Sequence, residues 1–314
     1  MKLASGMKAL WSPARLFAVT LACLGAGVVR GDDTDANSAA ALRAKYGVLR
    51  DQLGHNQFQR PLYMDSREAS GSVAGDIFAL INYPFATAGA ALNGPARWCD
   101  IMMLHINTKH CSASTASHGS VLQVSIGKKH DQPLGEAHRL QFAYRVAAAT
   151  PDYLKVMLTA DAGPLGTRDY HVMLEAVPVD GGGTFIHFTY SYAYGVAGGL
   201  AMQAYLGTIG SGKIGFTVVG KGSDGRPLHI GGMRGLVERN TMRYYLAIEA
   251  FLGALSVPPQ ARLEKSLHDW FAATERYPRQ LHDLEQREYL DMKRREYLRQ
   301  QAGARETARP EPGA

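Results

Sequence analysis

The order of the predicted secondary-structure elements constrains this fold more than any other feature of the chain. A strand at 67–81 is followed by short helices at 85–92 and 95–105. A series of strands then precedes one long amphipathic helix at 234–255, whose apolar residues share a face. This order predicts an α+β fold in which a curved antiparallel sheet wraps around the long helix and encloses a pocket.

The strands are recognised by alternation of apolar and polar residues. Leu140, Phe142, Tyr144 and Val146 alternate with polar or small neighbours, which is typical of a half-buried strand. We expect strands at 122–126, 140–146, 153–161, 168–179, 184–194 and 214–219, a short helix at 200–206 and a glycine-rich loop at 220–232.

The amino terminus has the pattern of an export signal. Basic residues precede an apolar run at 16–24, and small residues follow at 25–27. The run is shorter than the roughly 20 residues that span a bilayer. We therefore expect residues 1–31 to be a cleaved signal peptide and the mature protein to be periplasmic or secreted, with no transmembrane segment. The alternative is a lipoprotein anchored through Cys23. We rank it second, because the residues before Cys23 match a lipobox poorly.

Loss of this signal removes most of the net charge. The whole chain has 34 basic and 28 acidic residues, a formal charge of +6. Four basic residues and no acidic residue lie in 1–31, which leaves 30 against 28, or +2. A nearly neutral protein with mixed surface charges is not expected to bind nucleic acid.

Two cysteines remain after the signal, Cys99 and Cys111. An even number in an oxidising compartment predicts a disulfide, and two buried thiols are the alternative. A metal site that adds His105 or His110 lacks the paired C-x-x-C spacing of zinc sites. We expect no metal ion and no cofactor.

The stretch 207–213 nearly matches a phosphate-binding P-loop. That loop needs a Ser or Thr after its lysine to hold magnesium, and this chain has Ile214. A P-loop also runs from a strand into a helix. Here a helix is expected before the stretch, at 200–206, and a strand after it, at 214–219. We interpret the stretch as a glycine-rich turn.

Helical segments flank the central region on both sides. The amino-terminal one, at 36–54, has an apolar stripe, and two more are expected at 262–274 and 279–300. The last is dense in mixed charge. It repeats Arg-Glu-Tyr-Leu at 287–290 and 295–298, an eight-residue spacing that does not fit the heptads of a coiled coil. The expected organisation is a signal (1–31), an amino-terminal helix (32–60), a ligand-binding domain (61–257), a helical extension (258–300) and a disordered tail (301–314).

The element order resembles the START-like superfamily, which includes pollen-allergen-like proteins, polyketide cyclases and lipid-transfer domains. The resemblance is carried by Gly71-Ser72-Val73 through Ile81, by Pro84-Phe85, by Pro95-Ala96-Arg97-Trp98 and by the hairpin of 170–179 with 183–194. It covers roughly 60% of the chain and rests mostly on element order. It implies an exported bacterial member with a helix-grip fold and a hydrophobic pocket between sheet and long helix, and it transfers no catalytic residue.

Three polar residues, Asp169, His171 and Glu175, share one face of a predicted strand. A carboxylate near a histidine could perform acid–base chemistry. The same groups could instead orient a ligand or simply face solvent.

Tyr190, Tyr192 and Tyr194 form an aromatic stripe that packs in the core or lines the pocket. An even-length turn at 180–183 would place this stripe on the face of His171, with His187 on the other. The expected ligand contacts are Trp98, Tyr144, His171, Tyr190, Tyr192, Arg234, Met242 and Tyr245.

On the long helix, Arg234, Glu238 and Arg243 are expected on the solvated face, where ion pairs contribute little. Alternatively, Arg234 or Arg243 meets a ligand carboxylate or phosphate at the pocket mouth.

Three functions remain open. The leading hypothesis is an exported protein that binds a hydrophobic or amphipathic, lipid-like small molecule. The second is a cyclase- or hydrolase-type enzyme that uses Asp169, His171 or Glu175 in the same pocket. The third is an interaction protein whose segment 279–300 docks an envelope protein.

Overall fold

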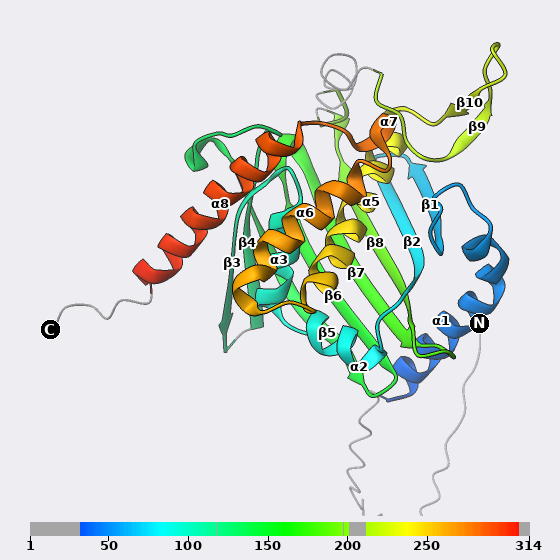
Figure 1. Ribbon diagram of the computed structural model, residues 1–314, viewed down its shortest axis with the longest axis horizontal. Coiled ribbons are helices and arrows are strands. Elements are labelled where there is room, and N and C mark those ends of the chain that lie inside the picture. The colour runs from blue at the N-terminus through cyan, green and yellow to red at the C-terminus, as the bar shows by residue number, and fades with distance from the viewer. Residues whose placement is uncertain (1–31, 118, 197, 201–211, 308–314) are drawn as a thin grey trace, which may run out of the picture.

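The computed structural model describes residues 32–117, 119–196, 198–200 and 212–307 (Figure 1). The expected signal peptide, nearly all of the expected helix at 200–206 and most of the P-loop-like stretch therefore lie outside the described residues. None of the helices in the described ranges is long and apolar enough to cross a membrane.

Eight strands form one curved antiparallel sheet in the order β1-β2-β8-β7-β6-β5-β4-β3 (Figure 1). Each strand joins its neighbours by an antiparallel ladder. The strands are β1 (Leu62–Ala69), β2 (Ser72–Ile81), β3 (Thr108–Ala116), β4 (Gly119–Ile126), β5 (His138–Thr150), β6 (Tyr153–Ala162), β7 (Thr167–Pro178) and β8 (Thr184–Tyr194).

Helices cover both faces of this sheet. The long helix α5 (Gly232–Ala254) crosses the concave face, and other helices lie beside it or over it (Figure 1). They are α2 (Phe85–Leu92), α3 (Pro95–Leu104), α6 (Arg262–Thr274), α7 (Pro278–Leu281) and α8 (Gln286–Thr307). The helix α1 (Asp32–Gly54) packs on the outer face, and a separate hairpin, β9 (Val218–Lys221) with β10 (Pro227–His229), projects from one end. This is the helix-grip arrangement that the START-like resemblance implies, so the expected fold class is confirmed.

The close approach of α5 to the sheet depends on a glycine in β2. A Cβ atom at Gly75 would lie 2.3 Å from the Thr241 hydroxyl oxygen of α5, well inside van der Waals contact. Val237, Thr241, Tyr244 and Ile248 recur at helical spacing and form the sheet-facing stripe of α5. The apolar core therefore lies between this stripe and the concave face.

Three strand predictions need correction. The expected single strand at 67–81 is the hairpin β1–β2, because Gly71 turns the chain at a φ of 74°. The edge strand β3 was missed, because its second half is exposed and lacks apolar alternation. The expected strand at 214–219 is wrong, since Val218–Lys221 belongs to the separate β9–β10 hairpin.

The expected solvated face of α5 is also wrong. Glu238, Arg239 and Arg243 are at most 2% exposed, because α6, α7 and the chain around Phe216 cover this side of the helix. Glu238 accepts hydrogen bonds from the backbone N–H groups of Phe216 and Thr217 and from the Ser66 hydroxyl at 2.5 Å. Arg243 donates to Asp283 at 2.6 Å. These charged side chains hold the segments that pack against α5. Sequence periodicity had predicted that they face solvent.

The charged helix α8 contributes to the core. Its residues Tyr289, Met292, Lys293 and Glu296 are at most 1% exposed, so much of the surface expected to dock an envelope protein is already covered. The helix also continues to Thr307, into the stretch expected to be disordered. Residues 308–314 lie outside the described part.

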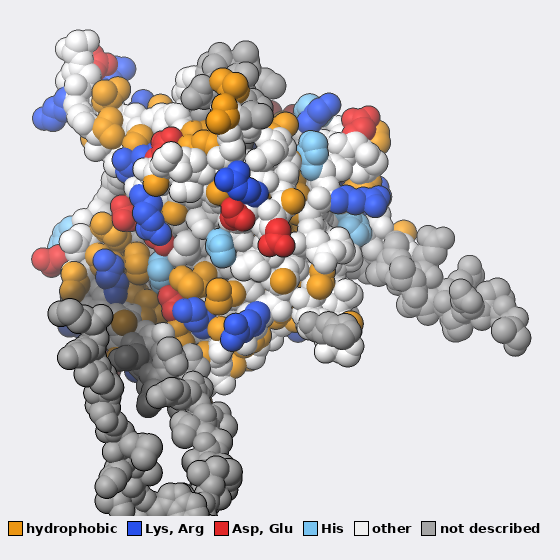
Figure 2. Space-filling view, turned by 180° about the vertical axis from the view of Figure 1, so that it is seen from behind, with side chains coloured by type: hydrophobic (Ala, Val, Ile, Leu, Met, Phe, Trp, Pro, Cys, Tyr) orange, Lys and Arg blue, Asp and Glu red, His pale blue; other side chains and the backbone are white. Residues whose placement is uncertain are grey.

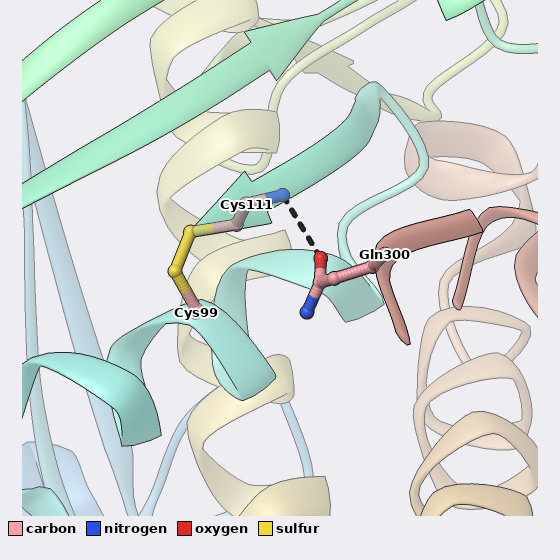
Figure 3. The surroundings of a disulfide bond; sticks show 3 residues. All are labelled: Cys99, Cys111 and Gln300. Atoms are coloured by element: carbon pink, nitrogen blue, oxygen red, sulfur yellow. Dashed lines mark hydrogen bonds between the residues drawn. A yellow bond between two sulfur atoms is a disulfide. The ribbon is translucent and has the colours of Figure 1, made fainter. Parts of the chain in front are cut away.

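The predicted disulfide is confirmed. Cys99 on α3 and Cys111 on β3 are bonded, with their Cα atoms 5.2 Å apart (Figure 3). The Cys111 backbone N–H donates to the side-chain oxygen of Gln300 at 2.9 Å, so α8 satisfies a donor at the edge of the sheet (Figure 3). The disulfide and α8 together hold β3, which has only one neighbouring strand.

Candidate functional site

A cluster of four tyrosines lies between the concave face of the sheet and α5. We call Tyr170 (β7), Tyr190 and Tyr192 (β8) and Tyr244 (α5) the tyrosine cluster. The Tyr170 and Tyr192 rings stack with centroids 5.3 Å apart, and Tyr190 lies 5.3 Å from Tyr244. Phe142 and Phe188 extend the cluster at centroid distances of 6.2 and 6.3 Å. Such distances are typical of aromatic packing.

Strand register brings these rings to one face. Tyr190 lies opposite Gly75 on β2 and Val172 on β7, and the same cross-strand row continues to Leu158 and Tyr144. Residues in one row point to the same side of the sheet, so Tyr144 and Tyr190 both face α5. Three strand spacings separate them, or about 14 Å. The row therefore supplies phenol groups at two places along the concave face.

The hydroxyl groups of the cluster are largely free of protein partners. Tyr170 shares a 2.7 Å hydrogen bond with the Thr167 hydroxyl, whereas the described residues form none with the hydroxyls of Tyr190, Tyr192 or Tyr244. Burial raises the pKa of all four phenols. They are therefore neutral at physiological pH and can each donate or accept a hydrogen bond.

Part of the side-chain surface at this cluster remains accessible. Tyr244 lies between α5 and the sheet, yet its side chain is only partly buried. Tyr144, Tyr170 and Tyr190 keep 7–8% of their surface. An apolar ligand would make its contacts through this residual aromatic surface.

His105 closes one side of the cluster. Its ring stacks on Tyr244 with centroids 4.6 Å apart and is 3% exposed. Burial, together with the charges of Arg243 and Lys293, lowers the pKa of His105 well below its usual value, so the ring is neutral. Its Nδ1 accepts from the Asn107 backbone N–H, which assigns the proton to Nε2. That Nε2 has no hydrogen-bond partner among the described residues.

Tyr144 presents a second polar atom with incomplete hydrogen bonding. Its buried hydroxyl makes no hydrogen bond of regular geometry within the described part of the chain; burial raises its pKa to about 12, although the nearby backbone N–H of Gly94 acts to lower it. Buried polar atoms without partners carry a free-energy cost of about 1–3 kcal/mol. A ligand with a polar group would recover part of that cost.

The expected shared face of tyrosines and acid–base residues is wrong. The β7–β8 turn places Pro178 opposite Thr184, so five residues, not an even number, connect the strands. Glu175 and His187 are therefore opposite one another on the outer face, and the tyrosine stripe is on the concave face.

Asp169, His171 and Glu175 do not converge on one point. His171 is exposed on the outer face, and Asp169 lies at a bulge with a φ of 53°, 3.3 Å from Arg168. Four residues of strand separate His171 from Glu175, or about 13 Å. The outer face seen in Figure 2 carries acidic, basic and histidine side chains interspersed with apolar ones.

Glu175 instead belongs to a triad that was not predicted. His187 Nε2 lies 2.9 Å from Asp76, and its Nδ1 lies 3.2 Å from Glu175. Tyr153 and Lys155 also contact Glu175. The histidine stacks on Phe78 with centroids 4.1 Å apart. Both ring nitrogens are occupied by carboxylates, so the triad joins β2, β8 and β7 as a structural bridge.

This triad makes stability depend on pH. Burial alone would lower the pKa of His187, but its hydrogen bonds to Asp76 and Glu175 raise it above 6.5. Burial alone would raise the pKa of Glu175, but hydrogen bonds from His187 and Tyr153 and the charge of Lys155 lower it to about 2. The His187 contribution is present below pH 6.5 and is lost as pH rises through the folded-state pKa. The Glu175 contribution is lost as pH falls from 4.5 toward 2.

We therefore expect His187→Gln to lower the free energy of unfolding by about 2 kcal/mol at pH 6 and by less at pH 9. Urea titrations at both pH values measure this difference. His171→Gln, a change on the same face without a buried partner, should leave both values nearly unchanged. Equal losses for His187→Gln at the two pH values would show that the charged imidazole does not stabilise the fold.

The other expected ligand residues are dispersed. Trp98 is 1% exposed, and its indole N–H donates to the Leu92 carbonyl. Arg234 donates to the Ser66 hydroxyl on β1 and thus lies beside the buried Glu238. Met242 and Tyr245 are fully buried on α5; Glu249 and Arg60 are charged neighbours of Tyr245. Of the residues expected to contact ligand, Tyr144, Tyr190 and Tyr192 lie on the concave face.

Tyr170, Tyr244 and His105 were missed. Tyr244 follows Val237 by seven residues and Thr241 by three, so the helical period could have placed it on the sheet-facing stripe. Tyr170 lies within a strand bulge between Arg168 and His171 that breaks the alternation. No sequence signal distinguished His105 from the other histidines.

Two hollows among the described residues lie away from the cluster. One, of about 10 Å³, is bordered by residues of α6 and α8, including Trp270, Phe271 and Tyr289, and has room for about one water molecule. The other is an open depression over Asp51, Gln52 and His55. The described residues contain no group of three or more His, Cys, Asp or Glu side chains arranged to hold a metal ion.

Comparisons with known proteins add structural neighbours only. No family model matches the chain, and neither does any curated protein sequence. Norcoclaurine synthase from Thalictrum flavum aligns at 10% identity over 48% of this chain and 82% of its own, with a TM-score of 0.31. An aromatase/cyclase from Streptomyces sp. R1128 aligns at 11% identity, 68% and 95% coverage and a TM-score of 0.29. Human StAR-related lipid transfer protein 5 aligns at 10% identity, 51% and 82% coverage and a TM-score of 0.27.

Proposed function

We propose that this protein binds a hydrophobic or amphipathic small molecule between the concave face of the sheet and α5. The observation that carries the proposal is the tyrosine cluster, in which Tyr244 is only partly buried and the hydroxyls of Tyr190, Tyr192 and Tyr244 lack hydrogen-bond partners among the described residues. Burial of apolar ligand surface supplies about 25 cal/mol per Å². The phenol groups hold the polar end of the ligand by hydrogen bonds.

The acid–base alternative has weaker support. Neutral phenols with raised pKa values are poor general bases, and the nearest histidine, His105, is buried and neutral. Asp169, His171 and Glu175 lie outside the cluster. Binding is therefore favoured over a cyclase- or hydrolase-type reaction. Export of the protein is part of the proposal and is supported by the basic, apolar and small residues of 1–31.

The first test is native mass spectrometry of protein purified without detergent, before and after organic extraction. We expect an added mass at one per chain that extraction removes. A protein that is empty, and that stays empty after incubation with total envelope lipid, would contradict the proposal.

A second test locates the site with the neutral fluorophore N-phenyl-1-naphthylamine. Ala160 and Thr159 are adjacent on β6, but Ala160 lies opposite Tyr170 and faces α5, whereas Thr159 faces outward. We expect Ala160→Phe to weaken probe binding at least about tenfold, because the new ring occupies ligand space. Thr159→Phe is the matched control and should bind as the unmodified protein does. Circular dichroism verifies that both variants fold, and equal binding by the two would place the site elsewhere.

A further inference from the structure

The charges around the tyrosine cluster restrict the class of ligand. The hydroxyl groups of the cluster receive no hydrogen bond from a lysine or arginine within the described ranges. Each cation near the cluster is engaged elsewhere. Arg239, whose charge reaches Tyr192, donates to the Ile214 carbonyl at 3.2 Å. Arg243 is bound to Asp283, and Arg234 donates to Ser66.

Acidic groups border the same region. Glu68 accepts a hydrogen bond from Tyr194 at 3.2 Å and raises the pKa of Tyr192 beyond the effect of burial. Glu238 is fully buried, where it is held by the backbone of Phe216 and Thr217 and by Ser66, which lies two strands from Tyr190 in the same row. A carboxylate entering this region would approach the Glu68 carboxylate, and the described cations named above are already bound to other groups.

The polar atoms that do face the cluster are neutral. They are the phenol hydroxyls, and the unpartnered Nε2–H of His105 lies beside Tyr244. Such groups form good hydrogen bonds with a hydroxyl or carbonyl oxygen. They do not compensate the desolvation of an ionised carboxylate, which is far larger than that of a neutral polar group. Stacked and tilted rings on both sides also favour a flat ring system over a flexible chain.

We propose that the site selects a neutral, flat, ring-containing ligand with a hydroxyl or carbonyl group and rejects anionic amphiphiles such as fatty acids. This inference rests on the proposed function, because it specifies the ligand class of the same pocket. It also argues against the expectation that Arg234 or Arg243 receives a ligand carboxylate or phosphate.

A matched pair of probes tests this selectivity. 9-Anthracenemethanol and 9-anthracenecarboxylate share one ring system and differ in a hydroxymethyl or an ionised carboxylate group at pH 8. Both are titrated into the purified protein, and binding is followed by anthracene fluorescence. We expect the alcohol to bind at least about tenfold more tightly, because the carboxylate has no cation to replace its lost water.

The variant Tyr190→Phe/Tyr244→Phe tests which atoms are responsible. It removes two hydroxyls while it retains the rings, so it should weaken binding of the alcohol severalfold and leave 9-methylanthracene unaffected. Tyr63→Phe, on β1 away from the cluster, is the matched control. Unchanged alcohol binding in the double variant would contradict the assigned role of these phenols.

The outcomes separate this inference from the proposed function. If the carboxylate binds as tightly as the alcohol, or more tightly, and Ala160→Phe abolishes both, the pocket exists and the neutral selectivity is wrong. If neither anthracene probe nor N-phenyl-1-naphthylamine binds in a saturable manner, both proposals are overturned.

Discussion

Replacement of Glu296 by Gln should lower the free energy of unfolding by about 3–5 kcal/mol, because it leaves two buried lysines without a counter-charge. Glu296 Oε1 lies 2.9 Å from Lys109 Nζ, and Oε2 lies 2.7 Å from Lys293 Nζ. The side chains of all three residues are at most 1% exposed. Burial already lowers the pKa of Lys293 to about 8 although Glu296 acts to raise it.

Chemical denaturation at pH 7 measures this loss, and Glu288→Gln is the control. Glu288 is on the exposed side of the same helix, so the same chemical change there should cost less than about 0.5 kcal/mol. Similar midpoints for the two variants would show that the lysines are stabilised without Glu296, by the backbone carbonyls that they also contact.

Removal of the disulfide by Cys99→Ala/Cys111→Ala should lower the free energy of unfolding by about 3 kcal/mol. The bond closes a loop across a sequence separation of 12 and restricts the unfolded chain. It also joins α3 to the edge strand β3, which has no second neighbouring strand. The loss is measured by urea titration with intact α-helix content verified by circular dichroism.

The unmodified protein, unfolded and refolded under strong reductant, provides the comparison for this variant. Its reduced form should lose stability by a similar amount, because both changes release the same loop. If the variant were as stable as the oxidised protein, the contacts of α8 with β3, including Gln300 with Cys111, would be sufficient to hold this edge.

Local patterns were sufficient for most of the fold. Alternation located β5 through Phe142 and Tyr144, and the 3.6-residue period located α5, because each pattern reflects one buried face. The strand β3 could not be located in this way. It lies at the edge under α8, half of it is exposed, and some of its contacts come from residues more than 180 positions away, such as Gln300.

The candidate site was only partly predictable. The stripe of Tyr190 and Tyr192 followed from alternation alone. Its side of the sheet depended on the parity of the β7–β8 turn, and one residue of difference moved His171 and Glu175 to the opposite face. Tyr244 lies on α5, and His105 lies at the end of α3. Local sequence patterns could not show that these two helices meet at the cluster.

The sequence by itself predicted most of the element order and the alternating faces of β5 to β8, because these depend on short-range periodicity, and it favoured a disulfide between Cys99 and Cys111 over two buried thiols. Only the tertiary structure decided which charges are buried. Glu238, Lys293 and Glu296 read as solvated positions on amphipathic helices, yet each is enclosed by a segment distant in sequence that supplies its hydrogen-bond partners. The sequence of a helix shows where its apolar stripe lies. How many of its other sides are buried depends on the elements that pack against it, which the helix sequence does not specify.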